Sequence, residues 1–304
     1  MSGAGWVRGP LMETLRGRVG VVTGGAGGLG RAIGERFARE GMKVVLADVQ
    51  AEPLERTVAE CRAAGLEIVG VVTDVTNQAS IDALRDATLD AYGAVHVVCN
   101  NAGIGAGAEG KMWEHELNDW KWAVGVNMMG VVHGINSFVP TMLAQDDEGH
   151  IINTSSGNGG VSPLPSTPQY AATKAAVVTI TECLYGQLQD VGGKIGASVL
   201  FPGPHILRTG LFESWRSRTA EFAKQRPRVT PYTTVEALEA QMKAAGVNIA
   251  YTPVEEVAEA VVAGLYANDF WIHPRSERGD TQLLARTDSI LNRTNPSYLR
   301  AVPG

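Results

Sequence analysis

Tyr170 and Lys174 are the residues of this sequence best suited to proton transfer. They stand four positions apart in a Tyr-Ala-Ala-Thr-Lys segment, so in a helix they share one face. A lysine ammonium beside a phenol stabilises the phenolate and lowers the pKa of the tyrosine from about 10 toward a useful range. A surface pair is the alternative interpretation, and the other motifs decide between the two.

A glycine-rich run could hold a phosphate group. Its sequence is Thr-Gly-Gly-Ala-Gly-Gly-Leu-Gly over residues 23–30, and it separates a predicted strand from a predicted helix. Glycines allow a tight turn and let the backbone approach a pyrophosphate, whose charge a helix N-terminus stabilises. The alternative is a plain strand-to-helix turn. The residues expected to contact a dinucleotide here are Gly24, Gly28, Leu29 and Gly30.

Asp48 predicts which dinucleotide the run would bind. It ends the second predicted strand, eighteen residues beyond Gly30, and Val49 and Gln50 after it carry no positive charge. A carboxylate there accepts hydrogen bonds from a ribose 2′-hydroxyl and repels a 2′-phosphate. We therefore expect NAD rather than NADP, with Asp48 and Val49 at the ribose. The alternative for Asp48 is a turn residue at the end of a strand.

A third motif follows the fourth predicted strand. Asn100 and Asn101 are followed by Ala102 and Gly103. Their amides and small side chains leave room for a ligand beside the backbone, although any turn could have this composition.

The elements that position these motifs alternate along the chain. Short β-branched runs and longer segments of helical period are typical of a parallel sheet with helices on both faces. The predicted strands are 18–23, 43–48, 67–73, 95–100, 150–155, 197–202 and 270–273. The predicted helices are 29–40, 52–64, 78–92, 118–143, 168–191 and 254–267. We expect an α/β fold with a single doubly wound Rossmann domain over 18–304, whose strand ends carry the candidate site.

The segment 205–252 interrupts this alternation. It is too long for a structureless loop, which predicts a partly helical substrate lid between the sixth strand and its helix. Its basic residues either bind an anionic group or form a solvated helix face; they are Arg208, Arg216, Arg218, Lys224, Arg226 and Arg228. The aromatic residues of this segment are Phe212, Trp215, Phe222 and Tyr232. An apolar set forms either a substrate surface or a small core of the lid; it comprises Trp113, Leu211, Phe212 and Trp215.

The three motifs in this order resemble the short-chain dehydrogenase/reductase family over residues 18–273. The resemblance implies that Ser156 is the catalytic serine, although it precedes Tyr170 by fourteen residues where the family most often has thirteen, so Ser155 is an alternative. Asn127 matches the family's fourth catalytic residue. The resemblance also implies cofactor contacts at Asp74, Val75, Asn101, Ala102, Gly103, Tyr170, Lys174, Pro202 and Gly203. The segment after Gly203 departs from the family pattern, which leaves contacts of Ile206 and Thr209 unassigned.

The resemblance implies an NAD-dependent oxidoreductase that acts on a secondary alcohol or ketone, which we expect to be bulky and hydrophobic or aromatic. Tyr170 would remove the hydroxyl proton and Ser156 would stabilise the same oxygen. Lys174 would lower the pKa of Tyr170 and hold the nicotinamide ribose, and Asn127 would hold a water that links Lys174 to solvent. The alternatives are a catalytically silent NAD-binding sensor or scaffold and an epimerase or dehydratase of the same family.

Composition excludes several other classes. A net charge of −6 without a basic cluster argues against nucleic acid as the main partner, and no apolar run reaches the roughly 20 residues that span a bilayer. Three scattered cysteines favour the reducing cytoplasm. The six histidines lack metal-ligand spacing, so no metal is expected. Residues 1–17 are expected to be a loose arm. Small residues on helices 118–143 and 168–191 allow close packing with another subunit, and the family resemblance implies a homotetramer or homodimer formed through such helices.

Overall fold

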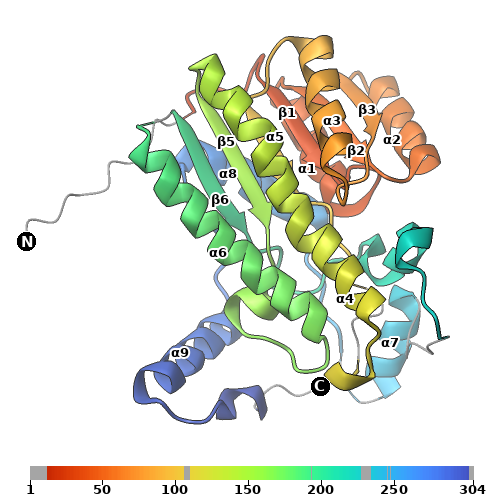
Figure 1. The fold of residues 1–304 in the computed structure, drawn as a ribbon, viewed down its shortest axis with the longest axis vertical. Helices are drawn as coiled ribbons and strands as arrows, with labels where there is room; N and C mark the ends of the chain where they lie inside the picture. The colour runs from red at the N-terminus through yellow and green to blue at the C-terminus, as the bar shows by residue number, and fades with distance from the viewer. Residues whose placement is uncertain are drawn as a thin grey trace, which may run out of the picture.

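Seven parallel strands form one sheet in the order β3-β2-β1-β4-β5-β6-β7 (Figure 1). The computed structural model describes residues 12–105, 110–192, 194–226, 234–244, 246 and 248–300. The strands are β1 Val19–Thr23, β2 Lys43–Asp48, β3 Ile68–Val72, β4 Val97–Asn100, β5 Gly149–Thr154, β6 Ile195–Leu200 and β7 Trp271–Ile272. All seven coincide with predicted strands. The strand order reverses between β1 and β4, so the carboxyl ends of these two strands form the switch point at which such sheets bind ligands.

Helices cover both faces of the sheet. On one face lie α1 Gly28–Arg39, α2 Ala51–Ala63 and α8 Val254–Ala267. On the other lie α3 Gln78–Tyr92, α5 Gly130–Gln145 and α6 Pro168–Asp190. Because both faces are covered, strands such as β1 are buried along their whole length. The fold is therefore the expected Rossmann-like α/β sandwich.

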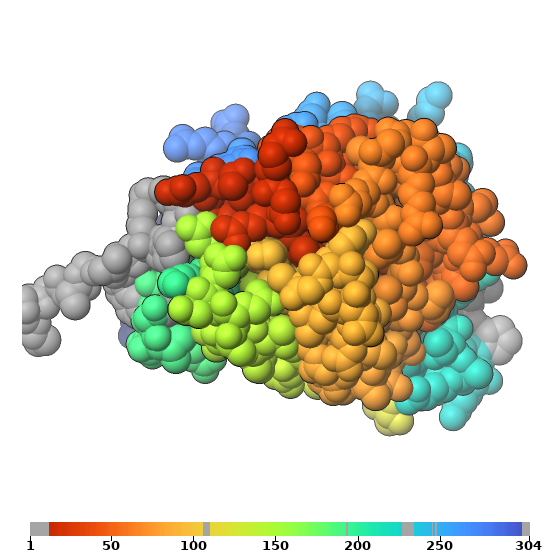
Figure 2. Space-filling model, turned by 90° about the horizontal axis from the view of Figure 1, so that it is seen from above, coloured from red at the N-terminus to blue at the C-terminus, as the bar shows by residue number. Residues whose placement is uncertain are grey.

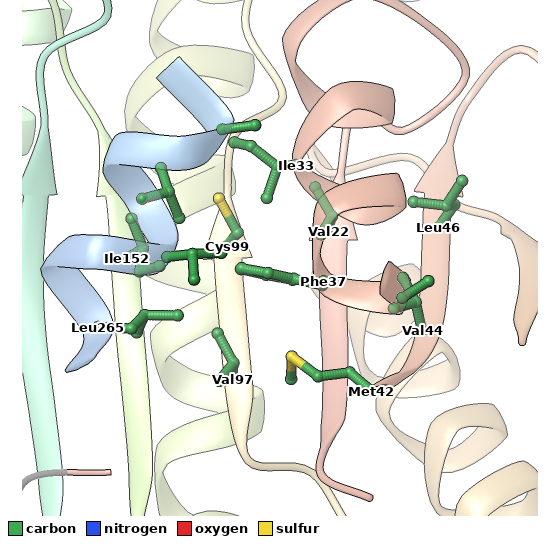
Figure 3. Packing of buried hydrophobic residues seen from close by; sticks show 14 of the residues in the cluster. Val22, Ile33, Phe37, Met42, Val44, Leu46, Val97, Cys99, Ile152 and Leu265 are labelled. Carbon is green, nitrogen blue, oxygen red and sulfur yellow. The ribbon is translucent and has the colours of Figure 1, made fainter. Parts of the chain in front are cut away.

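Apolar spacing on α1 explains how it packs. Leu29, Ile33 and Phe37 recur every four residues on its buried face. Figure 3 shows Ile33 and Phe37 in the same cluster as Val22 of β1 and Leu265 of α8. This packing fixes the start of α1 against the end of β1, where the glycine-rich run lies.

The predicted helix 118–143 is interrupted in the structure. It consists of α4 Leu117–Ala123, a π-helical turn η2 Val124–Met129 and α5. Gly130 N–H donates to the Gly125 carbonyl, five residues back rather than four. Such π turns occur frequently at functional sites, and Asn127 lies within this one.

The two chain ends differ from the sequence expectations. Residues 1–11 of the predicted loose arm lie outside the described residues, but Met12 and Leu15 are buried in the main core, so residues 12–17 are attached to the domain. At the other end, α9 Glu277–Asn292 and a short turn η6 Ser297–Arg300 were not expected. The sequence held one signal for α9, because serine is a preferred N-cap residue. In the structure Ser276 caps α9 by accepting from Gly279 N–H.

The lid, residues 205–252, contains η4 Gly210–Ser217, η5 Ala220–Phe222 and α7 Val235–Ala244. Figure 1 shows it at the carboxyl end of the sheet, together with α4. Figure 2 shows the opposite face, where the early segments in red and orange lie against the middle of the chain in yellow to green. Among the described residues, none of the helices combines the length and the apolar character that a membrane span requires.

Candidate active site

The glycine-rich turn and the Asn101 turn are packed against each other. A Cβ at Gly30 would collide with the Gly24 carbonyl oxygen and lie 2.8 Å from Asn101 Nδ2. A Cβ at Gly24 would lie 3.0 Å from Ala102 Cα. Only glycine allows this approach, so the sequence of the run is explained by the contact between the ends of β1 and β4.

The start of α1 fits a dinucleotide phosphate. Gly27 is the N-cap of α1, and neither a side-chain cap nor an acidic residue in the first turn compensates the helix N-terminus. A Cβ at Gly27 would meet nothing within 4 Å, so this side of the turn is open. Gly28 has φ +51°, which favours glycine. The first-turn N–H groups, which have no partner within the helix, and the open side of the turn suit an anion.

Asp48 lies against the same turn. Its Oδ2 accepts from Ala26 N–H at 3.1 Å and its Oδ1 accepts from Gln50 N–H at 3.0 Å. No ion pair of Asp48 occurs within the described residues. Each carboxylate oxygen can accept a further hydrogen bond, so Asp48 can both brace the turn and bind ribose hydroxyls. Val49 beside it is exposed.

Thr23 joins the two turns and was missed by sequence reasoning. Its Oγ1 accepts from the N–H groups of Asn101 and Ala102, each at 3.0 Å, and Asn101 Nδ2 donates to the Thr23 carbonyl at 3.0 Å. The sequence feature that could have identified Thr23 is its position as the first residue of the glycine-rich run. Gly103 continues toward the catalytic candidates, since a Cβ there would lie 3.4 Å from Lys174 Nζ and 3.5 Å from Asn127 Oδ1.

Tyr170 and Lys174 share one face of α6, as their spacing predicts. Lys174 is buried, its Nζ donates to the Thr154 carbonyl at 2.8 Å and lies 5.8 Å from the centre of the Tyr170 ring. Burial lowers the pKa of Lys174 to about 8. For Tyr170, burial raises the pKa above its ordinary value, and a hydrogen bond with Ser156 acts in the opposite direction. The lowering expected from Lys174 is therefore not found, because burial raises the pKa of Tyr170 by more than the Ser156 hydrogen bond lowers it.

The two adjacent serines have different partners. Ser155 is buried, and its hydroxyl donates to the Lys174 carbonyl at 2.7 Å. Ser156 is hydrogen-bonded to Tyr170 and accepts from Asn158 N–H at 3.2 Å. The hydroxyl of Ser156 therefore lies with the phenol, whereas that of Ser155 ties β5 to α6.

Asn127 is held by backbone groups. Its Oδ1 accepts from Ile104 N–H at 2.8 Å, and its Nδ2 donates to the Ile104 carbonyl at 3.1 Å and to Thr173 Oγ1 at 3.2 Å. The side chain is thus occupied in fixing the segment after Gly103 against α6. It stands beside Lys174 across Gly103.

The remaining predicted contacts lie farther along the strand ends. Asp74 Oδ1 accepts from Thr76 N–H at 2.9 Å, which makes it a turn residue in this structure. Val75 packs against α5, where a Cβ at Gly130 would lie 3.0 Å from its side chain. Pro202 and Gly203 follow β6 and are partly buried.

The lid is attached to α4 by buried charges. Arg218 pairs with Asp119 at 2.7 Å, and both side chains are almost fully buried. The Arg218 guanidinium also stacks over the Trp122 ring at 4.8 Å, and Lys224 lies 3.5 Å from Asp119. Burial raises the pKa of Asp119, but the Arg218 hydrogen bond and both cations outweigh it and leave the pKa below 3.8.

The structure shows what the basic side chains of the lid contact. Within the described part of the lid, Arg208, Arg216, Arg218, Lys224 and Arg226 all face acidic side chains of this same chain. Arg208, Arg216 and Arg226 are exposed, as a solvated face requires, whereas Arg218 and Lys224 are largely buried against Asp119. Phe222 joins a small cluster with Ile104 and Trp122, whereas Trp113 and Trp215 are exposed. Arg228 and Tyr232 lie outside the described residues.

Thr209 places the start of the lid over the glycine-rich turn. A Cβ at Gly28 would lie 3.1 Å from the Thr209 side chain. The lid also reaches the Asn101 turn, because Gly105 N–H donates to Ser214 Oγ at 3.1 Å. Across the described ranges, no three His, Cys, Asp or Glu side chains gather in a way that could hold a metal ion.

The doubly wound sheet with a glycine-rich turn at its switch point defines a dinucleotide-binding α/β protein. Comparison of sequences specifies it further, because the family model described as short chain dehydrogenase matches residues 18–220. The chain therefore belongs to the short-chain dehydrogenase family and is an oxidoreductase of that family.

Three similar proteins illustrate the family's range. A short-chain dehydrogenase/reductase from Burkholderia phymatum, solved in complex with NAD, is 41% identical, with a TM-score of 0.83 and coverage of 94% of this chain and 98% of that one. A variant of the actinorhodin polyketide ketoreductase, solved with NADPH, is 28% identical, with a TM-score of 0.67 and coverage of 84% and 92%. A hydroxy(phenyl)methylsuccinyl-CoA dehydrogenase subunit from Thauera aromatica is 32% identical over 221 residues, which are 70% of this chain and 82% of the relative.

Proposed function

We propose that this protein is an NAD-dependent dehydrogenase of bulky, aromatic or hydrophobic secondary alcohols, or a reductase of the corresponding ketones. The observation that carries the proposal is the hydrogen-bonded pair Ser156 and Tyr170, with buried Lys174 beside it, next to a glycine-rich turn open to an anion. These groups lie at the carboxyl ends of β1, β4 and β5 and at the start of α6.

In the oxidative direction the substrate O–H bond breaks and its proton passes to the Tyr170 phenolate. Ser156 donates to the same oxygen as a carbonyl forms there. When bound, the nicotinamide supplies the acceptor for the hydride that leaves the carbinol carbon. The Lys174 ammonium lies close enough to stabilise the phenolate, and Asn127 keeps the Ile104 backbone in place beside it.

The preference for NAD over NADP is part of the proposal. It is supported by Asp48 at the end of β2, whose carboxylate would repel a 2′-phosphate. Residues that would hold the dinucleotide are Gly24, Gly28, Leu29, Gly30, Asp48, Val49, Asp74, Val75, Asn101, Ala102, Gly103, Pro202 and Gly203. Relatives crystallised with NAD and with NADPH both exist, so the test must include both coenzymes.

The substrate class rests on the lid and on one relative. Trp113 and Trp215 are exposed, and Trp215 directly follows Ser214, which accepts from Gly105 N–H in the segment after β4. The Thauera aromatica relative is named for a substrate with a hydroxyl on a carbon that bears a phenyl group. A benzylic secondary alcohol is therefore the first compound to test.

The experiment is a fluorescence titration with NADH and NADPH, followed by an absorbance assay with NAD and matched aryl, steroid and aliphatic secondary alcohols. We expect tighter binding of NADH and turnover of an aryl alcohol. In Asp48→Ala the preference for NADH should shrink. Tighter binding of NADPH by the wild type would refute the coenzyme assignment, and NADH binding without turnover would favour the sensor.

Assembly and location belong to the same proposal. We expect a homotetramer or homodimer in the cytoplasm, acting on a small molecule without nucleic acid or membrane partners. An apolar groove between α5 and α6 supports self-association; its lining includes Val132, Ile135, Ile180 and Cys183. Analytical ultracentrifugation of the wild type and Ile180→Glu tests this, because a monomeric wild type would contradict it.

A further inference from the structure

Ser156 is the first residue of a short glycine-rich loop, and the loop determines where its hydroxyl lies. Residues 157–161 have the sequence Gly-Asn-Gly-Gly-Val and form the irregular turn η3. Asn158 N–H donates to Ser156 Oγ at 3.2 Å, and Gly160 N–H donates to the Ser156 carbonyl at 3.0 Å. Any displacement of this loop therefore moves Ser156 relative to Tyr170.

On its inner side, which faces α6, the loop is tightly packed. Gly159 has φ +107°, and a Cβ there would collide with the Ala171 carbonyl of α6, next to Tyr170. The side chain of Asn158 bonds within the connection to α6, accepting from Leu164 N–H at 2.9 Å. Glycine has large backbone freedom, so the loop also needs a constraint on its outer side.

Arg286 of α9 supplies that outer constraint. Its Nη1 donates to the Val161 carbonyl at 2.9 Å and makes a longer contact of 3.5 Å with the Gly159 carbonyl. Figure 1 shows α9 beside the connection between β5 and α6. Arg286 has no ion-pair partner within the described residues, so its charge serves these two carbonyl groups. A charged donor makes a stronger hydrogen bond than a neutral one.

The rest of α9 does not explain its position. None of its side chains is fully buried, and Leu283, Leu284, Ile290 and Leu291 are exposed. The helix also lies beyond residues 18–220, which the family model matches.

We propose that Arg286 is a positioning residue that holds the loop 157–161, and through it the Ser156 hydroxyl, in place beside Tyr170. The expected fall in kcat rests on the proposed function. The expected loosening of the loop does not. Arg286 acts through Val161 and Ser156 and does not touch the substrate. The C-terminal helix thereby becomes part of the support of the active site.

The test compares Arg286→Ala, Arg286→Lys and a matched control, Arg293→Ala. Among the described residues, the Arg293 guanidinium donates to the Leu291 carbonyl of its own segment. Hydrogen–deuterium exchange of residues 157–162 is measured first. We expect faster exchange in Arg286→Ala, intermediate exchange in Arg286→Lys, which keeps a single ammonium donor, and unchanged exchange in the control.

Kinetics then follow on the aryl alcohol. In Arg286→Ala kcat should fall by roughly tenfold to a hundredfold, the loss expected when a remote change displaces a catalytic group by about 1 Å. The KM for NAD should stay unchanged. The Ser156 hydrogen bond lowers the pKa of Tyr170, so weakening it should move the acidic limb of the kcat profile to higher pH.

Unchanged exchange, kcat and pH profile in Arg286→Ala would overturn the proposal. If Arg286→Ala fails to fold, Arg286→Lys decides, because wild-type values in that variant for all three measurements would overturn it as well. If the wild type turns over no alcohol, the proposed function fails, and the exchange data alone still decide whether Arg286 holds the loop.

Discussion

The two sides of the active site are held by different kinds of interaction. The strand side, meaning the turns that follow β1, β2 and β4, is fixed by hydrogen bonds of backbone groups with the short side chains of Thr23, Asn101 and Asp48. The lid side, meaning residues 205–226 on α4, is fixed by charges, with Asp119 and Arg218 at its centre.

The difference follows from the sheet. Paired strands bring the turns together in a register that short directional hydrogen bonds only need to complete. The described lid forms no strand with the sheet, so it needs longer side chains to reach α4. Buried charge pairs give weak net stability, although the loss of one partner is costly. The lid side should therefore depend on single residues more than the strand side does.

The largest effect on activity is expected from a substitution of Tyr170, the proposed proton acceptor. Tyr170→Phe removes the proton acceptor and should lower kcat by about 10²–10⁴-fold, with NADH affinity close to that of the wild type. The matched control is Tyr185→Phe on the same helix, whose ring packs on Phe270. Comparable turnover in both variants, measured by steady-state absorbance, would show that Tyr170 is not the base.

The next effect should fall on the lid side. Asp119→Asn leaves the buried Arg218 guanidinium without its carboxylate and should lower the free energy of unfolding by about 3 kcal/mol. Limited proteolysis should then cut the lid first. Glu213→Gln removes an exposed pair with Arg216 and should cost less than about 1 kcal/mol. Equal losses in the two variants, measured by urea unfolding, would contradict the importance of burial.

A smaller effect is expected on the strand side. Gly30→Ala introduces a Cβ into the contact between two turns and should destabilise the coenzyme-free protein by about 1–3 kcal/mol. Gly27→Ala places its Cβ in open space and should leave thermal unfolding of the coenzyme-free protein unchanged. If Gly27→Ala proved the more harmful of the two, the packed turn would not be the constraint.

Acid should act on the sheet before the lid. His150, in β5 at the end opposite the site, has its pKa lowered by burial from 6.5 to about 4. Between these pH values the unfolded chain binds more protons, so stability falls as pH falls, by at most about 1.4 kcal/mol per pH unit. The pKa of Asp119 lies below 3.8, so the lid pair stays charged over that range.

The check is urea unfolding of the wild type and His150→Gln from pH 6.5 down to about 4. In the variant, the free energy of unfolding should depend less steeply on pH, because the contribution of His150 is removed. Identical slopes would mean that another group drives the acid response. If a protease cut the lid at mildly acidic pH before the sheet lost stability, the expected order of acid sensitivity, sheet first and lid second, would be wrong.

The sheet was predictable because burial on both faces demands near-continuous β-branched runs, which β1 shows. The glycine-rich turn was predictable for a related reason, since close approach of two backbones excludes every side chain. By contrast, α9 was missed because none of its side chains joins the core, so its apolar residues gave no clear inward face.

The sequence by itself determined the fold, the switch point and the residues gathered there, because periodicity and glycine spacing are local properties. Only the tertiary structure decided which serine faces Tyr170, which acids neutralise the basic residues of the lid, and that burial sets the pKa of Lys174 to about 8. Those outcomes depend on contacts between residues far apart in the chain and on exclusion of water, and no local pattern encodes either.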